Sequence, residues 1–300
     1  MRMYEDIGTL IRKGFETWRR NLNLAVPFVL MIVAMMILAI FMVVLAFYPL
    51  ITGSPEVFST AGEIESPEEL AKLLSSATNL GLAASILLGG ILLIYLASSF
   101  FTAGAIGMAR EATDKGRTST KEMWASGRRH YLNLFAAEVI MMVVVIAGVV
   151  VLSLPFLSDL MGILEANEPE FGPIILWILL IAVYGLLVSI VLAVVPYALV
   201  VGGLGPIAAI RSGIGFVSSN KMDVFLIWLV VIAVSMAVQF LGIPFSGSQT
   251  SSGIFSMLNG ILSVLVISPL TTVWWTRLYM TRTGKIGEVE TVRDEEVKYL

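Results

Sequence analysis

The chain has 300 residues, of which 57% are hydrophobic and only 14% are charged. Soluble domains are about one half apolar and about one quarter charged, so this composition excludes a water-soluble globule as the main interpretation. The absence of cysteine excludes a disulfide scaffold. With a single histidine, it also leaves no residues for a zinc site built on cysteine or paired histidines.

Six stretches are long and apolar enough to form membrane helices, each of which needs about 20 such residues. They cover residues 24–48, 79–108, 134–156, 173–203, 224–244 and 254–280. No small-residue cleavage site follows the first stretch, so we expect a retained span and not a cleaved signal peptide. The sequence therefore predicts an all-α polytopic membrane protein, with a single membrane domain over residues 1–300.

The distribution of basic residues predicts how the spans are oriented. Of the 19 Lys and Arg residues, 18 lie in residues 1–20, in 109–132, in 204–223 or after residue 276. The remaining loops hold Lys72 and nine acidic residues. Lys and Arg accumulate in the short cytoplasmic loops of membrane proteins. We therefore expect a cell-membrane protein with both termini in the cytoplasm, which requires an even number of spans.

Matching segments suggest that one hairpin unit is used three times. Asn23, Asn133 and Asp223 each open an odd-numbered span, where such side chains can accept hydrogen bonds from the free amides of a first helical turn. Two even-numbered spans end in related small-residue segments, Gly104–Arg110 and Gly205–Arg211. These matches predict three parallel hairpins with the three polar residues as helix caps. Any helix bundle also needs caps, so a bundle without a repeat is the alternative.

Each odd-numbered span is preceded by a segment of mixed polarity, which predicts an amphipathic elbow helix at the membrane interface. These segments are residues 3–20, about 119–131 and about 206–219. We expect the second helix to start at Ser119 and the third at Pro206. Basic residues near these helices predict contact with anionic lipid headgroups: Arg19, Arg20, Arg128, Arg129 and Arg211. Residues 285–300 predict a charged cytoplasmic tail.

A few polar residues inside the spans are candidates for a cavity or path. Glu138 is the acidic residue well inside a predicted span, where an ionisable group is a functional candidate by default. Gln239, Asn259 and Ser263 lie on polar faces of the last two spans. The alternative is that Glu138 reaches the cytoplasmic interface and that the other residues form hydrogen bonds between helices.

Small residues and prolines predict features of helix packing. Gly81, Ser85 and Gly89 form a small-xxx-small ridge that is typical of close helix contact. Pro196 and Pro269 lie inside long spans and should kink them, because proline lacks the amide hydrogen of the helical ladder.

Enzyme signatures are missing from the sequence. It contains no H-E-x-x-H, no G-x-S-x-G, no Walker loop and no G-x-G-x-x-G that opens a helix. We therefore expect no catalytic residues, no cofactor and no bound metal. Because the basic residues are spread over interfacial loops, we expect anionic lipid as a partner, and no nucleic acid.

One segment resembles a known family. Pro196-Tyr197, then Gly205-Pro206-Ile207-Ala208-Ala209-Ile210-Arg211-Ser212, then Ser219-Asn220 and a new apolar span form the resemblance. The pattern is similar to the multi-helix membrane domain next to some bacterial glycerophosphodiester phosphodiesterases, and to related stand-alone prokaryotic families, including archaeal ones. The resemblance implies an integral membrane module. It does not imply phosphodiesterase activity, because the chain has no catalytic phosphodiesterase domain.

These observations favour a non-enzymatic protein that binds or translocates a small solute, ion or lipid through a cavity between the hairpins. The alternative is a membrane scaffold or accessory subunit that organises lipid or a partner protein without a transport path. An intramembrane lipid enzyme is a weaker alternative. Further expected partners are a second copy of the chain or another membrane protein.

Overall fold

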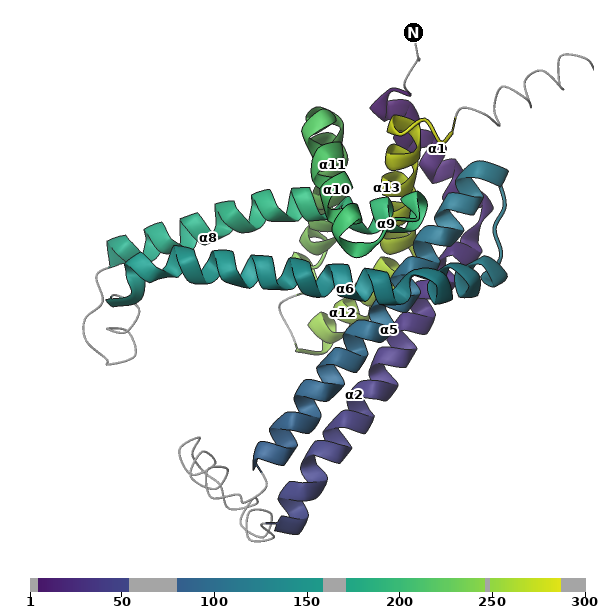
Figure 1. The fold of residues 1–300 in the computed structure, drawn as a ribbon. Helices are drawn as coiled ribbons and strands as arrows, with labels where there is room; N and C mark the ends of the chain where they lie inside the picture. Colours follow the sequence, from purple (N-terminus) through teal and green to yellow (C-terminus); the bar gives the residue numbers. More distant parts are fainter. Residues whose placement is uncertain (1–4, 54–79, 159–170, 246–248, 287–300) are drawn as a thin grey trace, which may run out of the picture.

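The computed structural model describes residues 5–53, 80–158, 171–245 and 249–286, and every regular element in them is helical (Figure 1). The longer helices are α1 (Ile7–Arg20), α2 (Val26–Gly53), α5 (Leu80–Lys115), α6 (Thr120–Ser153), α8 (Phe171–Leu192), α9 (Val195–Gly202), α10 (Pro206–Ser219), α11 (Lys221–Phe240), α12 (Gln249–Leu262) and α13 (Ser268–Arg282). Short 3-10 turns are η1 (Leu22–Ala25), η3 (Leu154–Phe156) and η4 (Ile243–Phe245), and η5 (Ser263–Ile267) is a π-helical segment.

Six helical segments are long and apolar enough to cross a membrane. They are Leu22–Tyr48, Gly81–Lys115, Thr120–Phe156, Phe171–Gly202, Lys221–Phe240 and Ser252–Arg282. Their positions match the six predicted spans, and the predicted all-α, six-span fold class is confirmed. The chain therefore has the architecture of a multi-pass membrane protein.

The helices meet at one end of the molecule and diverge away from it (Figure 1). Helix α2 runs beside α5, and α6 runs beside α8, so that each pair forms a long hairpin. The two hairpins point in different directions, and many large apolar side chains along them are exposed, as expected for surfaces that contact lipid. The four basic segments of the sequence all contribute helices to the end where the hairpins meet.

Helix α13 lies at the centre of this common end. Eleven of its 15 residues are buried, and it packs against α1, α5 and α9. Trp274 shows how close this packing is. Its indole Nε1 donates a hydrogen bond of 3.1 Å to the carbonyl oxygen of Ile11, and its ring lies directly over Gly14. The last span therefore supplies the core of the end where the helices meet.

Two of the three predicted elbow helices are separate helices, and one is not. Helix α1 begins after Asp6, whose side chain accepts a 3.0 Å hydrogen bond from the amide of Gly8, and α10 begins at Pro206 as predicted. The second elbow begins after Ser119 as predicted, but it continues without a break into the span as α6. Asn133 therefore lies inside a helix, where an asparagine costs at most about 0.7 kcal/mol relative to alanine. The internal repeat itself stays a prediction.

The two predicted proline kinks coincide with real interruptions. The fourth span is divided into α8 and α9 at residues 193–194, just before Pro196. The sixth span passes through the π-helical segment η5 immediately before Pro269. In both places the helix restarts with proline in its first turn, where a missing amide hydrogen costs little.

The predicted small-residue ridge is not a contact surface. A Cβ atom added to Gly81 or Gly89 would meet no atom within 4 Å. The neighbouring Gly90 is the packed position, since a Cβ there would overlap the side chain of Met42 in α2. The contact face of α5 is thus shifted by one residue from the predicted face.

Candidate functional site

The four polar residues predicted to share a path belong to four different elements, namely α6, α11, α12 and η5. Glu138 accepts a 2.5 Å hydrogen bond from the hydroxyl of Ser99, which is buried where α5 packs on α6. Gln239 is exposed on α11, while Asn259 on α12 and Ser263 in η5 are half-buried. Among the described residues, no hydrogen bond joins any two of these four. The structure does not bring them into one polar site.

None of the three predicted helix caps has that role. Asn133 lies inside α6, and Asp223 lies in the first turn of α11, after Asn220 at the cap position. Asn23 lies within η1, and its side-chain amide donates a 2.7 Å hydrogen bond to the carbonyl oxygen of Thr118. Asn23 and the Arg282-paired Asp223 form longer-range contacts in place of local amide bonds, and at Asn133 the helix continues without a break.

The turn between α5 and α6 is held by asparagines from the start of the first span. The buried Asn21 donates to the carbonyl oxygen of Gly116 at 3.1 Å and accepts from the amide of Thr118 at 3.1 Å. Gly116 has a φ of 75°, in the left-handed region that favours glycine. Together with Asn23, Asn21 fixes this turn against η1. No local pattern in the sequence indicates this role of Asn21.

Charged residues from both ends of the described chain form an ion-pair cluster. Arg277 is only 4% exposed and donates from Nε and Nη2 to the two carboxylate oxygens of Glu5, at 2.9 and 2.6 Å. Lys13 Nζ also donates to Glu5, at 2.7 Å. Arg282 Nε donates to Asp223 at 2.6 Å, and its Nη2 donates to the backbone carbonyl of Glu5 at 3.0 Å.

This cluster alters the titration of Glu5. Burial raises the pKa of its carboxyl, but the hydrogen bonds and positive charges of Arg277 and Lys13 outweigh burial. The pKa of Glu5 therefore lies below its ordinary value. The sequence offered little to identify the cluster, because its partners are separated by most of the chain.

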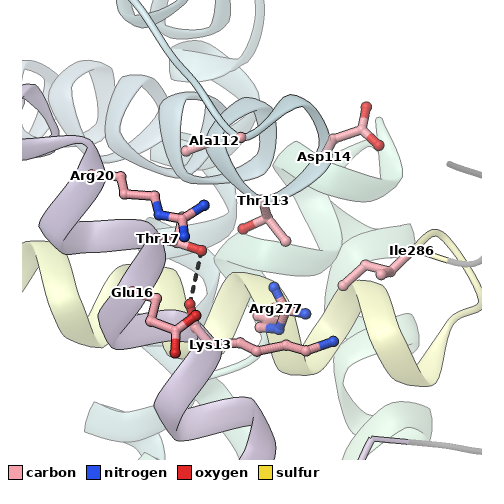
Figure 2. Close-up of a pocket in the computed structure, with 10 residues that line it drawn as sticks. Lys13, Glu16, Thr17, Arg20, Ala112, Thr113, Asp114, Arg277 and Ile286 are labelled. Atoms are coloured by element: carbon pink, nitrogen blue, oxygen red, sulfur yellow. Dashed lines mark hydrogen bonds between the residues drawn. The ribbon is translucent and has the colours of Figure 1, made fainter. Parts of the chain in front are cut away.

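A first cavity, the α1 cavity, lies between α1, the end of α5 and α13 and has a volume of ≈ 290 Å³. Figure 2 shows Glu16, Thr17 and Arg20 of α1 around it, with Thr113 of α5 and Arg277 of α13. Its lining also includes Lys13 and Asp114, so the cavity carries both signs of charge. The lining alone therefore favours neither an anion nor a cation.

A second cavity, the α9 cavity, has a volume of ≈ 460 Å³ and is lined by Arg110, Arg129, His130, Asn133, Val200, Val201, Gly202, Gly203 and Lys285. Its lining contains basic side chains and no carboxylate. Lys285 Nζ donates a 2.8 Å hydrogen bond to the carbonyl oxygen of Val201. Burial, followed by the positive charge of Arg110, lowers the pKa of Lys285 below its ordinary value.

The five arginines predicted to contact lipid are all exposed, and two of them also line a cavity. Arg20 also lines the α1 cavity and Arg129 also lines the α9 cavity. Across the described ranges, no group of three or more His, Cys, Asp or Glu residues is placed to hold a metal ion.

The chain was compared with known proteins. A family model described as "Domain of unknown function (DUF7847)" matches residues 6–281. An uncharacterised protein of Archaeoglobus fulgidus is 25% identical over 297 residues, which covers 95% of this chain and 98% of the relative. No solved structure matches the chain significantly. The family and the relative agree with the predicted resemblance to archaeal membrane families, but they contain no link to phosphodiesterases.

Proposed function

The chain belongs to the DUF7847 family of unknown function, and on this premise we propose that it is a non-transporting membrane scaffold that gathers anionic lipid. In this proposal both termini and the end where the hairpins meet face the cytoplasm. The exposed arginines there attract anionic headgroups, and each contributes about 1 kcal/mol near such a membrane surface.

The observation that supports this function is the meeting of all four basic segments around a packed core, while the hairpins diverge into the apolar region. A protein built in this way presents a cationic platform on one side and several separate apolar surfaces on the other. Such surfaces suit lipid, and they also suit a second copy of the chain or another membrane protein.

Transport of a small solute or ion is the rival function. It was predicted from a cavity shared by Glu138, Gln239 and Asn259. These residues belong to three different helices, Gln239 is exposed, and no hydrogen bond among the described residues joins any two of them. An intramembrane lipid enzyme and a phosphodiesterase-associated module are weaker rivals. Neither gains support from the groups around the α1 and α9 cavities, which form no nucleophile with an adjacent general base.

Reconstitution separates the scaffold from the transporter. The protein is placed in vesicles of mixed zwitterionic and anionic lipid, and two quantities are measured: the anionic fraction of the co-purifying lipid, and the leakage of entrapped potassium, protons and a small fluorescent anion. We expect anionic lipid to be enriched at low salt and less so at high salt, with leakage equal to that of empty vesicles.

Matched variants make this experiment specific. The triple variant Arg19→Gln, Arg20→Gln and Arg211→Gln should lose most of the enrichment. Lys72→Gln, on the predicted opposite side, should keep it. Leakage that depends on the protein and that Glu138→Gln abolishes would establish the transporter and overturn the scaffold.

A further inference from the structure

We propose that the α9 cavity is a binding site for a phosphate-type oxyanion. Its ligand is either the phosphate of an anionic lipid headgroup or free inorganic phosphate, and both present the same acceptor oxygens. This inference rests on the proposed function only where the ligand is a lipid. The cavity is a defined site with its own residues, in contrast to the diffuse attraction of exposed arginines for a charged surface.

The charges around the cavity favour an anion. Arg110 comes from α5, Arg129 and His130 come from α6, and Lys285 follows α13, so three separate elements direct basic groups to one place. Arginine keeps its proton in proteins, so Arg110 and Arg129 bring two positive charges to the cavity. Like charges held together repel one another, and an anion between them removes that repulsion.

Some hydrogen-bond donors of the side chains that line the cavity have no acceptor among the described residues. Within the described ranges, the side chains of Arg110 and Arg129 have no hydrogen-bond or ion-pair partner. Lys285 makes one hydrogen bond, to Val201, while an ammonium group has three donor hydrogens. Arginine adds a planar fork of donors, which matches the oxygen atoms of phosphate. The cavity therefore combines charge with unused directional donors.

Two features of the surroundings oppose an anion. The carboxylates of Glu111, Asp114 and Glu122 lie in a smaller neighbouring cavity of ≈ 170 Å³, which Arg110 and Arg129 also line. In addition, the C-terminus of α9 carries a partial negative charge of about one half unit. Neither opposing feature neutralises the site. No described carboxylate lies within ion-pair distance of either arginine, and Lys285 already covers the Val201 carbonyl of the α9 terminus.

The size of the cavity also fits such a ligand. Its volume of ≈ 460 Å³ lies within the range of about 300–1,000 Å³ that is typical of small-molecule sites. The α1 cavity is smaller and includes Glu16 and Asp114, which would repel an oxyanion. The α9 cavity is therefore the better site for phosphate.

Neighbouring arginines provide a matched test. Arg129 lines the cavity, whereas Arg128 is exposed beside it and does not. Replacing either with glutamine removes one charge at almost the same distance from the membrane. Glutamine is a good helix former, so both variants should fold. Binding of inorganic phosphate to the full-length protein in detergent is measured by thermal shift and titration calorimetry, with chloride at equal ionic strength as control.

We expect phosphate to bind the wild-type protein in preference to chloride. Arg129→Gln and Arg110→Gln should each weaken binding about tenfold, as expected when one charge-assisted hydrogen bond is lost. Arg128→Gln should change it by less than about twofold. Equal losses from Arg128→Gln and Arg129→Gln, or no response to phosphate or to lipid, would overturn the site.

A second arm identifies the source of the phosphate. Nanodiscs that contain phosphatidic acid are compared with nanodiscs of phosphatidylcholine alone, and the lipid retained by each variant is counted by native mass spectrometry. Retention of phosphatidic acid that is lost in Arg129→Gln but kept in Arg128→Gln assigns the site to a lipid headgroup. Binding of inorganic phosphate without such retention assigns it to free phosphate, and would contradict the lipid-gathering function while leaving the site intact.

Discussion

Arg277 and Glu5 form a bidentate ion pair across 272 positions of the chain, with nitrogen–oxygen distances of 2.9 and 2.6 Å. The pair joins the last span to the residue just before the first amphipathic helix. Because the guanidinium is buried in the core around α13, loss of the Glu5 carboxylate would leave its positive charge without this ion-pair partner.

Removing this carboxylate should destabilise the protein. Glu5→Gln leaves the buried Arg277 charge without its ion pair, and we expect the free energy of unfolding to fall by about 3 kcal/mol. The measurement is thermal or denaturant unfolding in detergent. Glu16→Gln is the control, because Glu16 pairs with Arg12 at 3.7 Å on the surface and should matter by less than about 1 kcal/mol. Similar losses for both variants would contradict this role of the pair.

Stability should depend on pH through Glu5. Its pKa in the folded state is lowered below the ordinary value of 4.5, so the pair contributes fully above that value. The contribution is lost as the pH falls through the lowered pKa, because the unfolded chain then binds the proton more readily. The melting temperature should be level above about pH 5 and fall below it. In Glu5→Gln this fall should be smaller, which a pH series of melting curves measures.

Two glycines of α5 should respond in opposite ways to the same substitution. In Gly104→Ala, the new Cβ would lie 2.8 Å from Met123 Cγ and 2.9 Å from the Met123 carbonyl oxygen, and a backbone atom cannot yield easily. We expect a loss of about 1–3 kcal/mol from overpacking. Gly89→Ala meets open space and should be neutral, or stabilise the helix by up to about 1 kcal/mol. Unfolding of the two purified variants tests the packing of α5 on α6.

The proposed orientation can be tested with single cysteines, because the chain has none of its own. Ser218→Cys, on the exposed face of α10, should react with a membrane-impermeant maleimide only after cells are opened. Ser66→Cys should react in intact cells. The reverse labelling pattern would show that the proposed topology is inverted, with the basic segments outside the cell.

The spans and several helix starts were predictable because their causes are local. Apolar length set the six spans, and Ser119 and Pro206 marked the starts of α6 and α10. The prediction that Asn133 caps a helix failed because it too depended only on a local preference. A local cap preference is worth about 1 kcal/mol, and the continuous hydrogen-bond ladder of α6 outweighs it.

The contacts at the end of the molecule where the basic segments meet could not be predicted from local sequence pattern. Asn21 binds the turn at Gly116, and Asp223 binds Arg282 in a different helix, so each acts through a residue far away in the sequence. The α9 cavity likewise draws on three elements. Arg129 was predicted as a basic residue of the interface, and nothing near it in the sequence distinguishes it from Arg128.

The central position of α13 has a consequence for biogenesis. Spans are synthesised and inserted in chain order, and the helix that fills the common core is the last of them. Until it arrives, α1 lacks the indole of Trp274, Glu5 lacks its guanidinium partner, and the cavity beside α9 lacks Lys285. The packing of α2 on α5 and of α5 on α6 needs no residue of α13, whereas the common core is complete only once α13 is in place.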